Sequence, residues 1–344
     1  MVSIVMMIFC TLFDSYYLDK GLALYRSLER VSKEFKLFVF CFDDKSFEIL
    51  NSQNLSQLIA IHHSSFETEE YLVVKEERSK AEYCWTCTPR VIEYVMDTYH
   101  VDSCTYLDSD LYFYSDPQVL FDEINNSDSD VAIVEHRFKD NSYGRKLEKR
   151  NGKYCVQFNY FKNTKNGRRV LLWWKEKCLE WCYDIPDSER MGDQKYLNTW
   201  TRDFAGVHEM KHLGGGVAPW NLEKYKLKSI HDDNVIMYDK SGLEFPLVFF
   251  HFQNIRYMPG RYVNIKSQTK NKKLKYAIYI PYLIEIEKIR KELEDDYGVL
   301  FNTKGIIRSS NIIISFLQKY LASLKIMTLS DVLNLDKLDE YIKK

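Results

Sequence analysis

Two aspartates separated by one residue, Asp108 and Asp110, follow a short apolar and aromatic run at residues 104–107. Such a run is typical of a buried strand. In an extended chain residues i and i+2 point to the same side, so the two carboxylates are expected to emerge together. Two hard oxygen ligands supply half of a site for Mg²⁺ or Mn²⁺ that keeps positions open for water and phosphate oxygens. The alternative is a surface turn, because D-S-D is turn-prone.

A histidine far along the chain is the third candidate ligand. His251 lies in the apolar run 246–252, which is expected to be a strand. Its imidazole would complete an Asp/Asp/His set that suits Mn²⁺, with the remaining positions left to diphosphate oxygens. The alternative is a buried histidine whose ring is satisfied by a backbone carbonyl.

Apolar runs of strand length alternate with segments of helical periodicity, which predicts a largely parallel α/β sheet with right-handed crossovers. Ligands bind at the carboxyl ends of the strands in such sheets, and several predicted strands end in polar residues. We expect strands at 3–13, 35–42, 58–61, 104–113, 131–134, 154–161 and 246–252. We expect helices at 17–28, 46–50, 69–99 with a break near Pro89, 170–183, from 192, 279–296 and 309–324, with loops at 141–153 and 214–221.

Composition excludes several classes of protein. The 344-residue chain has 45% hydrophobic residues and a formal net charge of −1 without a basic stripe, so no nucleic-acid partner is expected. Its eight cysteines form no disulfide framework, and the spacings of the pairs 84/87 and 178/182 favour reduced thiols over a structural zinc site. The N-terminus lacks a basic region and a cleavage site, and it reads as a strand, which predicts a cytoplasmic protein.

Four segments resemble, in order, the motifs of one enzyme family. They are Y-L-D-S-D-L at 106–111, F-N-Y-F-K-N at 158–163, G-D-Q-K-Y-L-N at 192–198 and F-H-F-Q at 250–253. On these motifs the chain resembles the GT-A fold glycosyltransferases, and most closely glycosyltransferase family 8, over roughly residues 1 to 258. The resemblance implies a Rossmann-like mixed, mainly parallel sheet flanked by helices.

The resemblance also implies an activity: metal-dependent transfer of a hexose from a nucleotide-diphosphate sugar, with a UDP-sugar favoured and with retention. The acceptor would be a glycan, a lipid-linked sugar or another hydroxyl compound. Asp108, Asp110 and His251 would hold Mn²⁺ or Mg²⁺ against the diphosphate. The implied catalytic residues are Asp193, Gln194 and Glu135. The implied donor- and acceptor-binding residues are Thr11, Phe13, Asp14, Tyr16, Ser109, Asn159, Gly215 and Gly216.

Three departures from the family pattern mark a divergent branch. Trp85 stands where the family has an arginine that faces the diphosphate, so Lys80 or Arg90 is expected to substitute. The glycines and lysine that follow the metal histidine in the family are absent, and Arg256 is expected to take the phosphate role. The segment 214–221, G-G-G-V-A-P-W-N, is not a standard piece of the family.

Two other functions remain open. In a phosphohydrolase of the haloacid dehalogenase type, Asp108 would be the nucleophile and a later acidic pair, such as Asp232 and Asp233, would bind magnesium. Leu111 stands where that class has a threonine or valine. A non-catalytic module that binds sugars or nucleotides would need no metal triad.

The chain is expected to divide into a catalytic domain at 1–260 and a C-terminal part at 261–344. This second part begins with a basic, exposed linker at 266–275 and continues with amphipathic helices. These helices are expected to pack on the core. The alternative is that residues 304–320 dock on the inner face of a membrane, near a lipid-linked acceptor.

Overall fold

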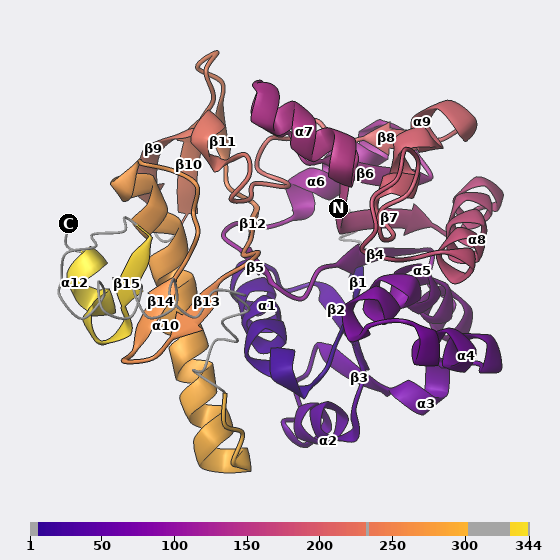
Figure 1. Ribbon diagram of the computed structural model, residues 1–344, viewed down its shortest axis with the longest axis horizontal. Helices are drawn as coiled ribbons and strands as arrows, with labels where there is room; N and C mark the ends of the chain where they lie inside the picture. The colour runs from indigo at the N-terminus through magenta and orange to yellow at the C-terminus, as the bar shows by residue number, and fades with distance from the viewer. Residues whose placement is uncertain (1–5, 232–233, 302–330, 343–344) are drawn as a thin grey trace.

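The structure, a computed structural model, describes residues 6–231, 234–301 and 331–342. Seven strands form the central sheet in the order β3-β2-β1-β4-β7-β6-β8 (Figure 1). Strands β3, β2, β1 and β4 are parallel, and β7 runs antiparallel to both β4 and β6. The bounds are β1 Met7–Phe13, β2 Phe35–Cys41, β3 Leu58–His62, β4 Ser103–Leu107, β6 Val131–Glu135, β7 Tyr154–Lys162 and β8 Val207–Glu209. This mixed, mainly parallel α/β sheet confirms the predicted fold class.

Helices cover both faces of the sheet, because successive side chains of each strand point to opposite faces. In β1, Phe9 and Phe13 belong to one apolar cluster, while Cys10 and Leu12 belong to another. The first cluster includes α1 Leu18–Val31, α2 Asp44–Ser52, α6 Gln118–Asn126 and α10 Lys272–Tyr297. The second includes α3 His63–Phe66, α4 Glu69–Glu77, α5 Lys80–Tyr99, α8 Lys165–Glu180 and α9 Trp200–Asp203.

Three small antiparallel sheets lie beside the central one, and the sequence did not predict most of their strands. The first pairs β5 Leu111–Phe113 with β12 Phe249–His251. The second contains β9 Lys226–His231, β10 Asn234–Tyr238 and β11 Glu244–Pro246. The third contains β13 Arg256–Met258, β14 Tyr262–Asn264 and β15 Val332–Asn334. Short 3₁₀ turns occur at Ser15–Tyr17, Lys195–Thr199, Leu222–Lys224 and Leu335–Lys337.

Local capping explains two departures from the expected helices. The break in the segment 69–99 lies at Arg78 and Ser79 and not at Pro89, which sits inside α5. Ser79 and Glu82 form a capping box, a motif that fixes a helix start. The segment expected as a loop at 141–153 contains helix α7, Ser142–Asn151, whose first turn is capped by Asn141.

The C-terminal part contacts the first helix through α10, which confirms the helix expected at 279–296. Arg26 of α1 pairs with Glu285 at 3.1 Å and with Glu292. Arg290 contacts Asp19, a carboxylate with only 1% exposure, at 2.7 Å. Helix α12, Leu338–Ile342, lies against α10.

The prediction of an exposed linker at 266–275 is wrong in part, because Ser267 and Lys275 are fully buried. Lys275 Nζ lies 2.5 Å from an oxygen of Asp331. The helix expected at 309–324 and the membrane contact expected at 304–320 lie outside the described residues. No described helix has the length and apolar character needed to cross a bilayer. All eight cysteines are free.

Candidate metal centre and active-site cavity

The two aspartates lie in the turn between β4 and β5, so the prediction of one extended strand over 104–113 is wrong. The chain turns because β5 leaves the central sheet to pair with β12, where Leu111 lies opposite His251. Leu111 N donates to Asp108 O at 3.2 Å within the turn. The turn still presents both acids at the carboxyl end of β4, the edge that the sequence predicted.

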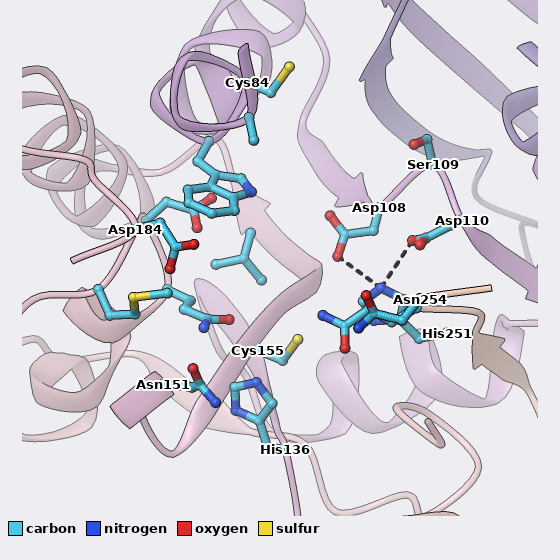
Figure 2. A pocket seen from close by; sticks show the side chains of 18 of the residues that line it. Cys84, Asp108, Ser109, Asp110, His136, Asn151, Cys155, Asp184, His251 and Asn254 are labelled. Atoms are coloured by element: carbon cyan, nitrogen blue, oxygen red, sulfur yellow. Dashed lines mark ion pairs between the residues drawn. The ribbon is translucent and has the colours of Figure 1, made fainter. Parts of the chain in front are cut away.

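The three predicted metal ligands converge on one point (Figure 2). His251 Nε2 lies 3.0 Å from Asp110 Oδ1 and 3.7 Å from Asp108 Oδ2. One ligand atom from each residue lies within 4.8 Å of the other two. Two carboxylates and an imidazole at this spacing fit a hard or borderline divalent ion such as Mn²⁺ or Mg²⁺.

The imidazole of His251 is held in place from behind. Its Nδ1 lies 3.0 Å from Oε1 of Gln157, a fully buried residue of β7. The ring of Trp220 packs edge-on against it, with centroids 5.3 Å apart. Nε2 therefore faces the acids, as a metal-ligating nitrogen must. Sequence reasoning missed Gln157, although it lies in the expected strand 154–161, two residues before Asn159.

Burial and mutual charge set the protonation of this site. Burial raises the pKa of Asp108 to about 7, although the His251 imidazole opposes the shift. Burial also acts to raise the pKa of Asp110, but the same imidazole outweighs it and lowers this pKa below the usual value. Burial acts to lower the pKa of His251, but the charges of Asp110 and Asp108 raise it above its usual value. Without a cation, protons on Asp108 and His251 offset the repulsion between the two carboxylates.

The cluster forms part of the wall of a cavity of about 910 Å³. This volume suits a ligand of the size of a nucleotide sugar. Nine predicted site residues line it: Phe13, Asp14, Lys80, Asp108, Ser109, Asp110, Asp193, Gln194 and His251. Of these, Lys80 pairs with Asp14, whose other oxygen accepts from Tyr16 N at 2.9 Å.

The other predicted site residues do not line the cavity. Glu135 pairs with Lys153 at 2.7 Å, and Arg90 donates to Glu93 at 2.8 Å and to Phe66 O. Tyr16 is 73% exposed, beneath the ammonium of Lys80. Five predicted site residues remain outside the cavity lining. Thr11 and Asn159 are buried, Gly215 and Gly216 are packed closely against neighbouring side chains, and Arg256 of β13 is exposed.

Asp193 differs from its expected position at the start of an α-helix. Residues 195–199 form only a 3₁₀ turn, and Asp193 precedes it in an irregular turn. Burial and the nearby Asp108 charge raise the pKa of Asp193 to about 8. Its backbone oxygen accepts from Trp174 Nε1 at 2.9 Å, while its buried Oδ2 has no hydrogen-bond partner within the described part of the chain.

One wall of the cavity could not be foreseen, because it comes from the segment expected to be a loop. Helix α7 contributes Tyr143, Leu147, Arg150 and Asn151. Tyr17, Cys84 and Trp85 also line the cavity, as do His136, Gln253, Asn254 and Trp220, whose ring contacts His251.

The comparisons with known proteins agree with this architecture. No family model matches the chain. A crystal structure of an active-site mutant of LgtC superposes with a TM-score of 0.50 at 15% sequence identity, over 79% of this chain and 95% of that one. LgtC is named a galactosyltransferase in another crystal structure. The superposition identifies the GT-A glycosyltransferase fold.

Two proteins of Bacillus subtilis strain 168, both described as uncharacterized, are similar in sequence. YfnD is 28% identical over 298 residues, which span 84% of this chain and 91% of YfnD. YfnF is 31% identical over 253 residues, which span 72% of this chain and 81% of YfnF. The chain therefore belongs to the protein family of YfnF.

Proposed function

We propose that this protein is a metal-dependent glycosyltransferase that transfers a hexose from a nucleotide-diphosphate sugar, with a UDP-sugar favoured, to a hydroxyl acceptor. The observation that carries the proposal is the convergence of Asp108, Asp110 and His251 on the wall of a large cavity. The GT-A fold supports it, as does the resemblance of the sequence motifs to glycosyltransferase family 8. In that family the anomeric configuration is retained, which we propose here too.

The proposed chemistry follows from the charge of the leaving group. Breaking the bond between a sugar and a nucleoside diphosphate leaves a highly charged diphosphate. Asp108, Asp110 and His251 would hold Mn²⁺ or Mg²⁺, which would supply a Lewis acid to stabilise this charge. Asp108 and Asp110 would provide two carboxylate oxygens and His251 one imidazole nitrogen, and three protein ligands would leave room for phosphate oxygens.

The remaining cavity residues suggest how the donor and acceptor lie. Asp14, Tyr17 and Lys80 stand together at the end of β1, where the nucleoside is proposed to bind. Asp193 and Gln194, which line the cavity, are proposed to contact the transferred sugar. The acceptor, a glycan or a lipid-linked sugar, is proposed to enter along α7.

A haloacid-dehalogenase-type phosphohydrolase is not favoured, because the central sheet has the GT-A order and Asp108 faces a histidine. Asp232 and Asp233, which that function would need, lie outside the described residues. A binding module without catalysis is the outcome that an activity assay distinguishes.

The test is incubation with Mn²⁺ and a panel of UDP- and GDP-sugars, with the released nucleoside diphosphate measured. We expect slow metal-dependent release, lost in Asp110→Ala and retained in Asp122→Ala, a control at an exposed acid of α6. Release of phosphate from phosphomonoesters without any effect of nucleotide sugars would overturn the proposal. Metal-independent binding of nucleotide sugars without turnover would instead indicate a binding module.

A further inference from the structure

A second cluster of metal-ligating side chains lies where β2 and β3 end. Asp44 is the first residue of α2, His62 the last residue of β3 and His63 the first residue of α3. The parallel strands β2 and β3 pair with Cys41 opposite His62, so both end at the same edge of the sheet. The α2 start therefore places Asp44 beside the two histidines. None of the three lines the cavity described above.

The ligand atoms of this cluster meet at one carboxylate oxygen. Asp44 Oδ1 lies 2.8 Å from His62 Nε2 and 3.0 Å from His63 Nε2. The three ligand atoms all lie within 4.8 Å of one another. The imidazole side chains are 29% and 28% exposed and Asp44 is 73% exposed, so an ion can reach them from solvent.

The other ring nitrogens have partners of the kind that orient metal-binding histidines. His62 Nδ1 lies 2.7 Å from Ser64 Oγ, and His63 Nδ1 lies 3.4 Å from Glu67 Oε2. Glu67 is itself fixed, because its side chain is only 3% exposed and its Oε1 accepts from Lys75 Nζ at 2.6 Å and Tyr83 Oη at 2.9 Å. Carboxylate or hydroxyl partners on the outer nitrogen keep the inner nitrogen aimed at the ion.

Without a cation, the cluster is a hydrogen-bonded network centred on one carboxylate oxygen of Asp44. Without a cation both Nε2 atoms must donate to the same oxygen of Asp44, and His63 stands between two carboxylates. The Ser64 amide then donates to His62 Nδ1 at 3.3 Å. With a cation on both Nε2 atoms, His63 Nδ1 would donate to Glu67 and His62 Nδ1 would donate to Ser64 Oγ, and the Ser64 amide would give up its bond to His62 Nδ1.

We propose that Asp44, His62 and His63 bind one Zn²⁺ ion, with water in the fourth position. Two imidazoles and one carboxylate form a common three-ligand zinc set, and imidazole favours zinc over the magnesium or manganese expected in the cavity. The ion ties the start of α2 to the start of α3. It would also fix the position of Asp43, the residue before Asp44. Asp43 accepts from Ser15 N at 3.0 Å and from Ser15 Oγ at 2.7 Å, and Ser15 follows the cavity residue Asp14.

The experiment measures zinc per chain, by elemental analysis after equilibrium dialysis of the untagged protein against Zn²⁺. We expect the wild type to hold one equivalent more than His62→Gln/His63→Gln and than Asp44→Asn, which keeps a residue suited to a helix start. His231→Gln, an exposed histidine on β9, is the matched control and should hold the wild-type amount. Circular dichroism establishes that each variant is folded.

A crystal soaked in Zn²⁺ should in addition give an anomalous difference peak between the three side chains. The same zinc content in the wild type and in both folded ligand variants would overturn the proposal, as would a soaked crystal without a peak there. Neither result depends on glycosyltransferase activity, and zinc bound by Asp108, Asp110 and His251 remains equal in all variants.

Discussion

The Oε1 atom of Gln157 lies 3.0 Å from the Nδ1 atom of His251, and it fixes which nitrogen of that imidazole faces the two aspartates. The two residues come from different strands, β7 and β12, which are 94 residues apart in the chain. Gln157 is fully buried, so water cannot replace its oxygen without opening the site. Gln157 therefore positions the candidate metal ligand His251 although it is not one of the three candidate ligands.

Replacing this partner should weaken metal binding without removing a ligand. We expect Gln157→Met to lower the affinity for Mn²⁺ by about 10- to 100-fold, because the imidazole loses its orientation. Gln157→Glu keeps an acceptor at the same place and should retain most of the affinity. Electron paramagnetic resonance of free Mn²⁺ measures both constants. Equal affinity in the Met variant and the wild type would show that Gln157 does not position His251.

Metal binding should depend on pH near neutrality. With a pKa of about 7 for Asp108 and a raised pKa for His251, both groups carry protons in the empty site below pH 7. A cation requires both to lose them, so affinity should rise with pH, by about tenfold per pH unit for each group still protonated. Calorimetry at pH 6 and pH 8, in buffers with different ionisation enthalpies, counts the released protons. An affinity that is constant over this range would contradict the assigned protonation states.

The buried arginine before α5 should be important for stability. Arg78 donates to the carbonyl oxygens of Cys178 at 2.7 Å and Leu179 at 2.6 Å, near the end of α8. Arg78→Met leaves these acceptors unsatisfied, so we expect a loss of about 2 to 4 kcal/mol in the free energy of unfolding. Arg202→Met, at a side chain that is 74% exposed, should change it by less than about 0.5 kcal/mol. Urea denaturation compares the two variants.

The ion pair between α10 and α1 provides a test of how the C-terminal part is attached. Arg290→Ala leaves the Asp19 carboxylate buried without its partner, which should cost about 3 to 5 kcal/mol. Asp19→Asn/Arg290→Leu removes both charges and should recover part of the loss. Arg261→Ala, at an exposed ion pair with Asp336, should cost less than about 1 kcal/mol. If Arg290→Ala were as mild as Arg261→Ala, the α1 contact would contribute little to the fold.

Strand periodicity predicted the strands of the central sheet except the short β8, because most of them are apolar on both faces. Strands β1, β2, β6 and β7 lie within a few residues of their expected bounds. The same signal failed for β9, β10 and β11, whose half-exposed residues show no continuous apolar run. The loop expected at 141–153 failed for the opposite reason: α7 buries only Gly144, so its sequence has no apolar stripe.

The convergence of the three candidate metal ligands was predictable from residue type and order, but the residues that support them were not. Asp108, Asp110 and His251 meet as expected even though the extended strand assumed for the aspartates is a turn. Gln157 and Trp220 carry no spacing that marks them, because their role depends on strand pairing between distant segments. Arg90 and Arg256 were assigned by position relative to the motifs, and neither lines the cavity.

The shallow attachment of α7 has a consequence for how the protein can diversify. Only Gly144 of this helix is buried, and a side chain there would collide with the backbone oxygen of Lys139. Tyr143, Leu147 and Arg150 line the cavity from this helix without being buried, so their exchange should cost little folding free energy. Substitutions in α7 could therefore change which ligand the cavity accepts, while Asp108, Asp110 and His251 stay the same.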